Sequence, residues 1–327
     1  MRRREFIRLL GGGAAVWPVA ARAQRPAMPV VGFLGLGTLD EARVNFTLIG
    51  RGLTQAGFAE GRNLSVQFRC ADYHSDRLAL LASELVKSEV AAIIAASGPA
   101  TSAARAATTT IPIVFFTGFD PVVSGFVASL NRPGGNLTGI FTLNPDLMVK
   151  RLELLHELIP AARSVALLFS PIVNASSDAT IRDLNAASHK LGMRLMLQQA
   201  SAPADFEQTF EALVRERADA VLVGADAVFT NNRDQLVALA ARHRVPMIYP
   251  IRECSEAGGL LSYGTNYPDA YKQVGIYTGR ILKGDKPADL PVQQVTRFET
   301  IINLKTAKAL GLDIPAGILA RADEVIE

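Results

Sequence analysis

The sequence is poor in the residues on which many metal and catalytic sites depend. Its 327 residues include only two cysteines, Cys70 and Cys254, and four histidines. The cysteines stand far apart and form no C-x-x-C pair, so we expect two unpaired thiols rather than a disulfide that organises the fold. The histidines lack metal-ligand spacing, which predicts that the protein has no metal site.

Motifs that mark common enzymes and nucleotide-binding proteins are also absent. There is no G-x-S-x-G elbow and no Walker loop with its lysine. The fragment Gly35-Leu36-Gly37 follows an apolar run but lacks the third glycine of a dinucleotide fingerprint. We therefore predict no catalytic residue and no cofactor, although an exported α/β enzyme remains an alternative.

Residues 1–23 have the form of a signal peptide. The segment Arg3-Arg4-Glu5-Phe6-Ile7-Arg8 resembles the twin-arginine export motif, and Ala21-Arg22-Ala23 has the small-x-small form of a cleavage site. The apolar run between them is shorter than the roughly 20 residues that span a bilayer. This predicts cleavage after Ala23 and a periplasmic protein with no direct membrane insertion.

The charge of the mature chain is close to neutral. The full sequence has 34 lysine and arginine residues and 31 acidic residues, but the leader contains five of the arginines and one glutamate. Removing the leader leaves a net charge of about −1. Because no dense basic patch with interleaved aromatic residues occurs, we do not expect a nucleic-acid partner.

Short apolar runs alternate with helical patterns along most of the chain. This order predicts an α/β fold built from doubly wound parallel sheets. We expect residues 29–141 plus 259–292 to form an N-terminal lobe and residues 142–258 plus 293–327 to form a C-terminal lobe. The chain would then cross between the lobes three times.

The stretch 91–121 predicts a complete βαβ unit. Two buried strands flank a short alanine-rich helix that begins near Ser97-Gly98-Pro99. Proline suits the first helical position, and the N–H groups at a helix start suit a carboxylate or another small anion. The alternative is that Ser97 only caps the helix.

Further polar and aromatic residues stand at the predicted strand ends. If the two lobes face each other, these ends converge on one cleft that suits a zwitterion with an apolar side chain. The candidate ligand-binding residues are Gly37, Thr38, Ser97, Gly98, Thr101, Phe119, Asp120, Asn174, Asp226, Tyr249, Tyr263 and Thr265. The alternatives are that Asp120 and Asp226 cap helices and that Phe119 and Tyr249 belong to the core.

Several longer stretches together resemble a known family. They are VVGFLGLGT (30–38), TTIPIVFFTGFDPVVSGFVASLNRPGGNLTGI (109–140), KRLELLHELIP (150–160), GGLLSYG (258–264), RILKGDKPADLPV (280–292) and INLKTAKALGLDIP (302–315). The mature chain resembles the substrate-binding proteins of ABC importers, in the branch that includes tryptophan-binding lipoproteins. The resemblance implies a type I periplasmic binding protein fold, with two Rossmann-like lobes joined by a three-strand hinge.

The resemblance also implies how such a protein works. A small carboxylate-bearing ligand, such as an aromatic amino acid, would be trapped by closure and delivered to an ABC permease and its ATPase at the inner membrane. The turn 97–101 resembles the element that grips the ligand's carboxylate, and Asp226 takes the acidic position that pairs with an amine. The chain departs from the lipoproteins in having no lipidated cysteine, and it has Phe119 where others carry a small polar residue. A ligand sensor for a membrane receptor remains the alternative.

Overall fold

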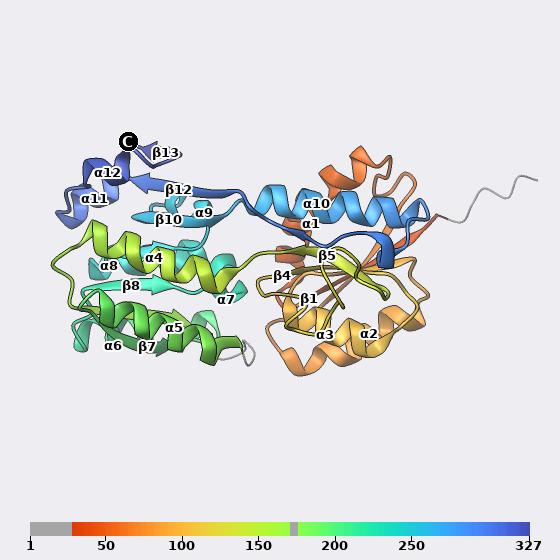
Figure 1. The fold of residues 1–327 in the computed structure, drawn as a ribbon, viewed down its shortest axis with the longest axis horizontal. Coiled ribbons are helices and arrows are strands. Elements are labelled where there is room, and N and C mark those ends of the chain that lie inside the picture. The colour runs from red at the N-terminus through yellow and green to blue at the C-terminus, as the bar shows by residue number, and fades with distance from the viewer. Residues whose placement is uncertain (1–27, 171–175) are drawn as a thin grey trace, which may run out of the picture.

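The computed structural model describes residues 28–170 and 176–327, which form two α/β lobes lying side by side (Figure 1). The predicted leader therefore lies outside the described residues. Both cysteines are free thiols, as predicted, and they belong to different lobes. No helix in the described ranges is both long enough and apolar enough to cross a bilayer.

Lobe 1 is a parallel sheet with helices on both faces. Its strands, in order across the sheet, are β11 (Gln293–Gln294), β5 (Leu137–Phe141), β4 (Ile113–Thr117), β3 (Ala92–Ala95), β1 (Val30–Gly35) and β2 (Ser65–Cys70). One face is covered by α1 (Leu39–Gln55) and α10 (Tyr267–Leu282), and the other by α2 (Leu78–Lys87) and α3 (Gly98–Ala107) (Figure 1). The four inner strands, β5, β4, β3 and β1, are largely apolar, as expected for strands that are buried on both faces.

The pair α1 and α10 packs closely because two glycines meet at the crossing. A Cβ on Gly52 would lie 1.9 Å from the backbone oxygen of Lys272, and a Cβ on Gly275 would lie 2.0 Å from that of Ile49. Any larger side chain would push the helices apart. The contact fixes α10 against lobe 1 and thereby the position of its first turn, which reaches the space between the lobes.

Lobe 2 has the same layered design. Its strands, in order across the sheet, are β13 (Glu324–Ile326), β12 (Phe298–Asn303), β10 (Leu261–Thr265), β9 (Met247–Tyr249), β8 (Ala220–Val223), β6 (Ser164–Phe169) and β7 (Arg194–Gln199). One face carries α4 (Asn144–Leu158), α5 (Ser176–Lys190), α11 (Leu304–Leu310) and α12 (Ala316–Leu319). The other carries α6 (Phe206–Arg215), α7 (Ala227–Asn231), α8 (Arg233–His243) and α9 (Arg252–Glu256). Every pair of neighbouring strands is parallel except β10 with β12.

The chain crosses between the lobes three times, after β5, after β10 and after β11 (Figure 1). This arrangement confirms the predicted class of two doubly wound lobes. The predicted boundary at residue 259 was wrong, because β10 pairs with β9 and β12 in the sheet of lobe 2. The boundary at 293 differs by two residues, because β11 pairs with β5 in lobe 1.

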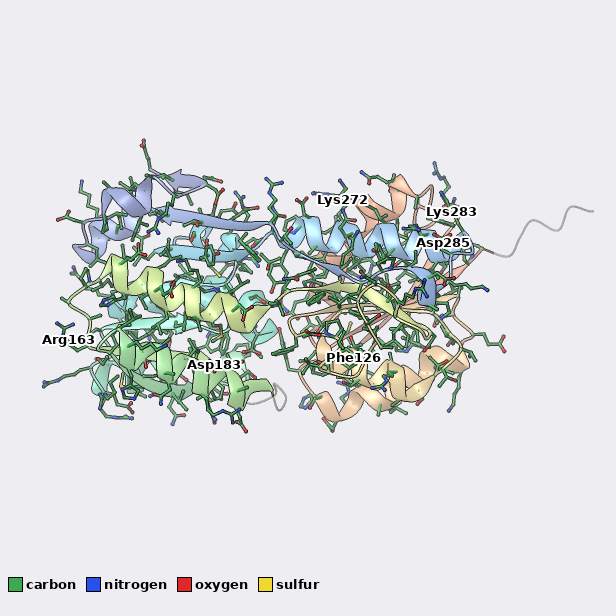
Figure 2. All side chains as sticks on the ribbon, in the orientation of Figure 1. Phe126, Arg163, Asp183, Lys272, Lys283 and Asp285 are labelled. Carbon is green, nitrogen blue, oxygen red and sulfur yellow. The ribbon has the colours of Figure 1, made fainter. Side chains whose placement is uncertain are left out.

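The segment 121–130, which follows β4, forms turns rather than a helix. Asp120 Oδ1 accepts hydrogen bonds from the backbone N–H groups of Val122 and Val123, and one turn forms. Gly125 then adopts a φ of +68° and ends the turn before a helix can grow. The segment packs on the sheet through Phe126, whose ring centroid lies 6.1 Å from that of Phe115 (Figure 2).

Candidate functional site

A cavity of about 200 Å³ lies between the lobes, at the carboxyl ends of the parallel strands. This is where ligands bind in open α/β sheets. Six of the residues predicted from the sequence line it, namely Gly37, Thr38, Ser97, Gly98, Phe119 and Asp226. They come from both lobes, as expected for strand ends that converge on one cleft.

Most of the remaining lining is apolar and aromatic. The larger of these side chains are Phe33, Leu36, Phe116, Met148, Leu167, Phe169, Ile181, Val228, Tyr267 and Tyr271. The sequence analysis did not single them out. Its only available signal was their place at or just beyond the ends of predicted strands and helices, which many core residues share.

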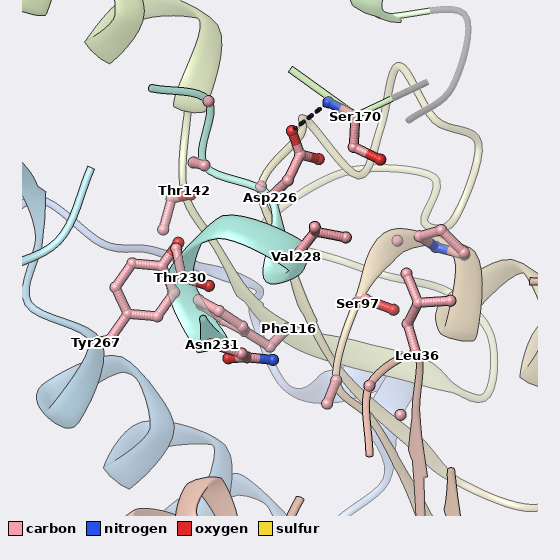
Figure 3. Close-up of a pocket in the computed structure, with 18 of the residues that line it drawn as sticks. Leu36, Ser97, Phe116, Thr142, Ser170, Asp226, Val228, Thr230, Asn231 and Tyr267 are labelled. Atoms are coloured by element: carbon pink, nitrogen blue, oxygen red, sulfur yellow. Dashed lines mark hydrogen bonds between the residues drawn. The ribbon is translucent and has the colours of Figure 1, made fainter. Parts of the chain in front are cut away.

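Three of these rings form a connected wall on the lobe 1 side. The centroids of Phe116 and Tyr267 lie 5.5 Å apart with their planes at 78°, and those of Phe116 and Tyr271 lie 5.0 Å apart. Tyr267 and Tyr271 are separated by 6.2 Å. Edge-to-face and tilted contacts of this kind are favourable for aromatic rings. All three rings line the cavity, and Figure 3 shows two of them, Phe116 and Tyr267.

Asp226 supplies a carboxylate from lobe 2. It stands at the N-terminus of α7, yet its side chain makes no capping bond to that helix. Instead, Oδ2 accepts a hydrogen bond from the backbone N–H of Ser170 at 3.3 Å (Figure 3). Burial raises the pKa of Asp226 to about 6, against the lowering effect of that hydrogen bond.

The described lining of the cavity offers no cationic side chain to pair with this carboxylate. Among the described lining residues, the only charged ones are Glu41 and Asp226. Glu41 is already engaged, because its Oε2 accepts a hydrogen bond from the N–H of Thr38 at 2.7 Å. Nor does the described part of the chain contain a group of three or more histidine, cysteine, aspartate or glutamate side chains that could hold a metal ion. Asp226 is therefore a partly buried carboxylate that a cationic group would stabilise.

The N-terminus of α3 faces the same cavity from lobe 1. Ser97 is its N-cap, and its Oγ accepts a hydrogen bond from the N–H of Ala100 at 3.3 Å. Gly98 and Pro99 line the cavity beside it. The first N–H groups of a helix have no partner within the helix, and its dipole favours a negative group there. Ser97 thus caps α3, as the alternative reading had it, and also lines the cavity.

Two of the predicted residues, Thr101 and Asp120, stabilise turns near the cavity and do not line it. Thr101 is fully buried, and its hydroxyl donates to the carbonyl oxygen of Ser97 at 2.8 Å, so it supports the turn rather than lining the cavity. Asp120 caps the turn that follows β4. Asp120 therefore has a capping role, as the alternative to ligand binding proposed.

Three other predicted residues lie away from the cavity in lobe 2. Tyr249 is 1% exposed and belongs to the core cluster beneath α8 and α9, as its alternative held. Tyr263 contacts the ring of Phe298, and its backbone oxygen accepts a hydrogen bond from the buried Arg151. Thr265 is buried on β10. None of these three residues belongs to the described lining of the cavity.

The last predicted residue, Asn174, lies outside the described residues. Two polar lining residues that the sequence analysis missed, Thr230 and Asn231, belong to α7. This five-residue helix was not predicted, since it follows β8 directly and has no helical periodicity of its own. Asn231 is notable because its side chain reaches across to lobe 1.

Comparison with known proteins gives one curated relative and several solved structures of the same fold. The chain is 27% identical over 275 residues to the tyrosine-binding protein of Clostridioides difficile (strain R20291), covering 84% of this chain and 78% of the relative. A conserved domain protein from Vibrio cholerae has a TM-score of 0.81 at 26% identity, covering 91% of this chain and 99% of the other.

Two further similar structures differ in whether a ligand is bound. A domain from Streptococcus pneumoniae in complex with L-Trp has a TM-score of 0.80, whereas the ligand-free, open structure of a substrate-binding protein from Clostridium difficile has a TM-score of 0.61. Both are 24% identical to this chain and cover 91% of it. Both structures show that the fold of this chain is shared with them.

The family assignment rests on the length of the match. The sequence model of the ABC transporter substrate-binding proteins matches residues 38–326, which include lobe 2, all of lobe 1 after β1, and all three crossings. This agrees with the resemblance noted in the sequence and with a family of binding proteins rather than enzymes. The chain therefore belongs to the ABC transporter substrate-binding protein family.

Proposed function

We propose that the protein is an exported receptor of an ABC importer that captures an amino acid with an aromatic side chain. The ligand would bind in the cavity between the lobes and be delivered to a membrane permease whose ATPase supplies the energy. The observation that carries this proposal is the partly buried Asp226 carboxylate, which faces a cavity whose described lining contains no cationic side chain.

An ammonium group on the ligand would supply the missing positive charge. A carboxylate whose pKa is raised by burial gains most when an opposite charge arrives beside it. The ligand's own carboxylate would lie at the N-terminus of α3, beside Ser97 and Gly98. A zwitterion would thus contact both lobes, with its ammonium group at Asp226 of lobe 2 and its carboxylate at the N-terminus of α3 in lobe 1.

The side chain of the ligand would lie against the wall of Phe116, Tyr267 and Tyr271. An apolar cavity of about 150 Å³ holds a benzene ring, so 200 Å³ suits a somewhat larger aromatic group. The names of two relatives, which refer to tyrosine and L-Trp, support the same class of ligand. A ligand that contacts both lobes favours the closed arrangement, which is how binding would shift the population of open and closed forms.

Binding tests this proposal directly. Protein purified without added ligand is examined by native mass spectrometry, refolded to remove any bound molecule, and titrated calorimetrically with L-tryptophan and L-tyrosine. Tryptamine, which lacks the carboxylate, and indole-3-propionate, which lacks the amine, separate the two anchors. We expect indole-3-propionate to lose more affinity than tryptamine, and no binding of any of the four would overturn the amino-acid assignment.

A matched pair of variants isolates the charge of Asp226. We expect Asp226→Asn to lower the affinity for L-tryptophan at least about tenfold, because charge-assisted hydrogen bonds contribute about 1.5–3 kcal/mol. The control is Asp183→Asn, which removes the same charge at an exposed position of α5 (Figure 2). Equal affinity of the two variants would count against the pairing of Asp226 with an amine.

Export is a separate part of the proposal and has its own test. The support is the twin-arginine motif and the cleavage site that ends at Ala23. We expect the protein in the periplasmic fraction with Gln24 as its first residue. Replacing Arg3 and Arg4 by lysine should leave the full-length precursor in the cytoplasm, whereas a processed periplasmic product would show another export route.

A further inference from the structure

A strained turn of lobe 1 lies beside the cavity. Asp72 and Tyr73, between β2 and α2, have φ values of +50° and +64°, a conformation that residues other than glycine rarely adopt. The backbone N–H groups of Asp72 and Tyr73 donate to the carbonyl oxygens of Gly37 and Leu36, at 3.1 and 2.7 Å. The turn is therefore fastened to the β1–α1 turn, and backbone strain of this kind clusters at functional sites.

The strained conformation directs Tyr73 toward a side chain that lines the cavity. Its hydroxyl donates to Glu41 Oε1 at 2.5 Å, while the other oxygen of Glu41 accepts from the N–H of Thr38 at 2.7 Å. Both oxygens of this carboxylate are thus held by lobe 1. Burial, together with the bond to Glu41, raises the pKa of Tyr73 above its usual value, so the hydroxyl remains protonated.

The same hydroxyl also receives hydrogen bonds from lobe 2. The side-chain amides of Asn231 and Asn232 donate to Tyr73 Oη at 3.3 and 3.5 Å. Because the single hydroxyl proton goes to Glu41, the hydroxyl accepts from both amides. The Tyr73 ring moreover packs against the core cluster of lobe 2 that contains Val228 and Phe229.

We propose that Tyr73 is a positioning residue that fastens the two lobes together in the closed arrangement. It does so by holding Glu41 of lobe 1 and Asn231 of lobe 2, which both line the cavity, in one hydrogen-bonded chain. Tyr73 itself does not line the cavity, so it acts through these two side chains. This inference concerns lobe closure and holds whatever the ligand is.

Closure and release follow from this geometry. The bonds that Asn231 and Asn232 donate to Tyr73 break when the lobes separate, whereas the bond that Tyr73 donates to Glu41 lies within lobe 1 and persists. Losing the cross-lobe bonds should destabilise the closed form relative to the open one, and a bound ligand should leave faster.

The matched variants are Tyr73→Phe and Tyr277→Phe. Each removes one phenolic hydroxyl and keeps the ring, but the Tyr277 hydroxyl donates to the carbonyl oxygen of Pro291, within lobe 1. With L-tryptophan or L-tyrosine as the probe, we expect Tyr73→Phe to raise the dissociation rate about fivefold and Tyr277→Phe to leave it unchanged. Similar melting temperatures for the two variants would separate positioning from general stability.

A second measurement needs no ligand and therefore does not depend on the proposed function. Spin labels on Ala79→Cys of α2 and Asp183→Cys of α5, both exposed, report the distance between the lobes in a Cys70→Ser background. The buried Cys254 stays unlabelled. We expect the empty protein to show a closed fraction that Tyr73→Phe lowers and Tyr277→Phe does not.

Asn231→Ala completes the test. If one chain of hydrogen bonds holds the lobes, Asn231→Ala added to Tyr73→Phe should lower the closed fraction much less than it does in the wild type. An unchanged closed fraction in Tyr73→Phe, including the absence of a closed form in both proteins, would overturn the proposal. If neither amino acid binds, the proposed function fails and the distance measurement alone decides the role of Tyr73.

Discussion

The ring of Tyr267 meets that of Phe116 edge to face, with centroids 5.5 Å apart, although the two residues belong to distant parts of the sequence. Phe116 lies near the carboxyl end of β4, and Tyr267 is the first residue of α10, where the chain re-enters lobe 1. The second crossing therefore brings a ring to the cavity wall. A segment of the hinge region and a strand end of lobe 1 together form the aromatic surface.

Phe116→Leu should weaken the binding of an aromatic ligand. An aromatic contact contributes about 0.5–1.5 kcal/mol beyond burial, so we expect a loss of affinity for L-tryptophan of about three- to tenfold. The control is Phe206→Leu, which removes a fully buried ring that contacts Phe229 in lobe 2, away from the cavity. Calorimetry and thermal unfolding of both variants separate the effect on binding from the effect on stability, and an equal loss of affinity in both would contradict this role of Phe116.

The alternation of strands and helices could be predicted from the sequence because it depends on local patterns. Thr38 and Glu41 have capping-box spacing, and the structure shows both bonds at the start of α1. The assignment of β10 to a lobe failed because its apolar run fits either sheet. Pairing with β9 and β12 depends on residues elsewhere in the chain, which the run itself does not reveal.

The candidate site could be predicted only in part for the same reason. Ser97 and Asp226 follow β3 and β8 directly, and the rule that parallel strands end at one edge was enough to place them at the cavity. Tyr249 also follows that rule but points into the core of lobe 2. The direction of a side chain at a strand end depends on local packing, and Asn231 reaches the site from a helix that sequence patterns do not reveal.

Gly37→Ala should disturb the cavity, whereas Gly50→Ala should not. A Cβ on Gly37 would lie 2.0 Å from Glu41 Oε2, so the carboxylate would have to leave the N–H of Thr38. We expect a loss of about 1–2 kcal/mol in the free energy of unfolding, together with weaker ligand binding. Gly50 lies in α1 with open space around its Cα, and its change to alanine should stabilise the protein by about 0.5–1 kcal/mol. Chemical denaturation measures both, and a neutral Gly37→Ala would contradict the contact with Glu41.

Asp226→Asn should stabilise the empty protein at neutral pH. The carboxyl has a pKa of about 6 in the folded protein and an ordinary value of 3.8, so the folded state binds its proton more tightly than the unfolded state does. The wild type is therefore penalised as pH rises from about 4 to 6, and the penalty is complete above pH 6. We expect the variant to be more stable by about 1–2 kcal/mol at pH 7.5, with the difference vanishing below pH 4. Denaturation curves across this range would contradict the assignment if the difference were the same at every pH.

The same carboxyl should make ligand binding depend on pH. An ammonium group pairs with the ionised form of Asp226, so binding lowers the pKa of Asp226 and releases a proton wherever the carboxyl of the empty protein is protonated. Affinity should then be nearly constant from pH 7 to 8 and fall below pH 6, reaching a loss of about tenfold at pH 5. Calorimetry with L-tryptophan in buffers of different ionisation enthalpy measures both the affinity and the released protons. Asp226→Asn should bind more weakly and show no such slope, since it has no proton to lose, and a slope that persists in Asp226→Asn would assign the titration to another group.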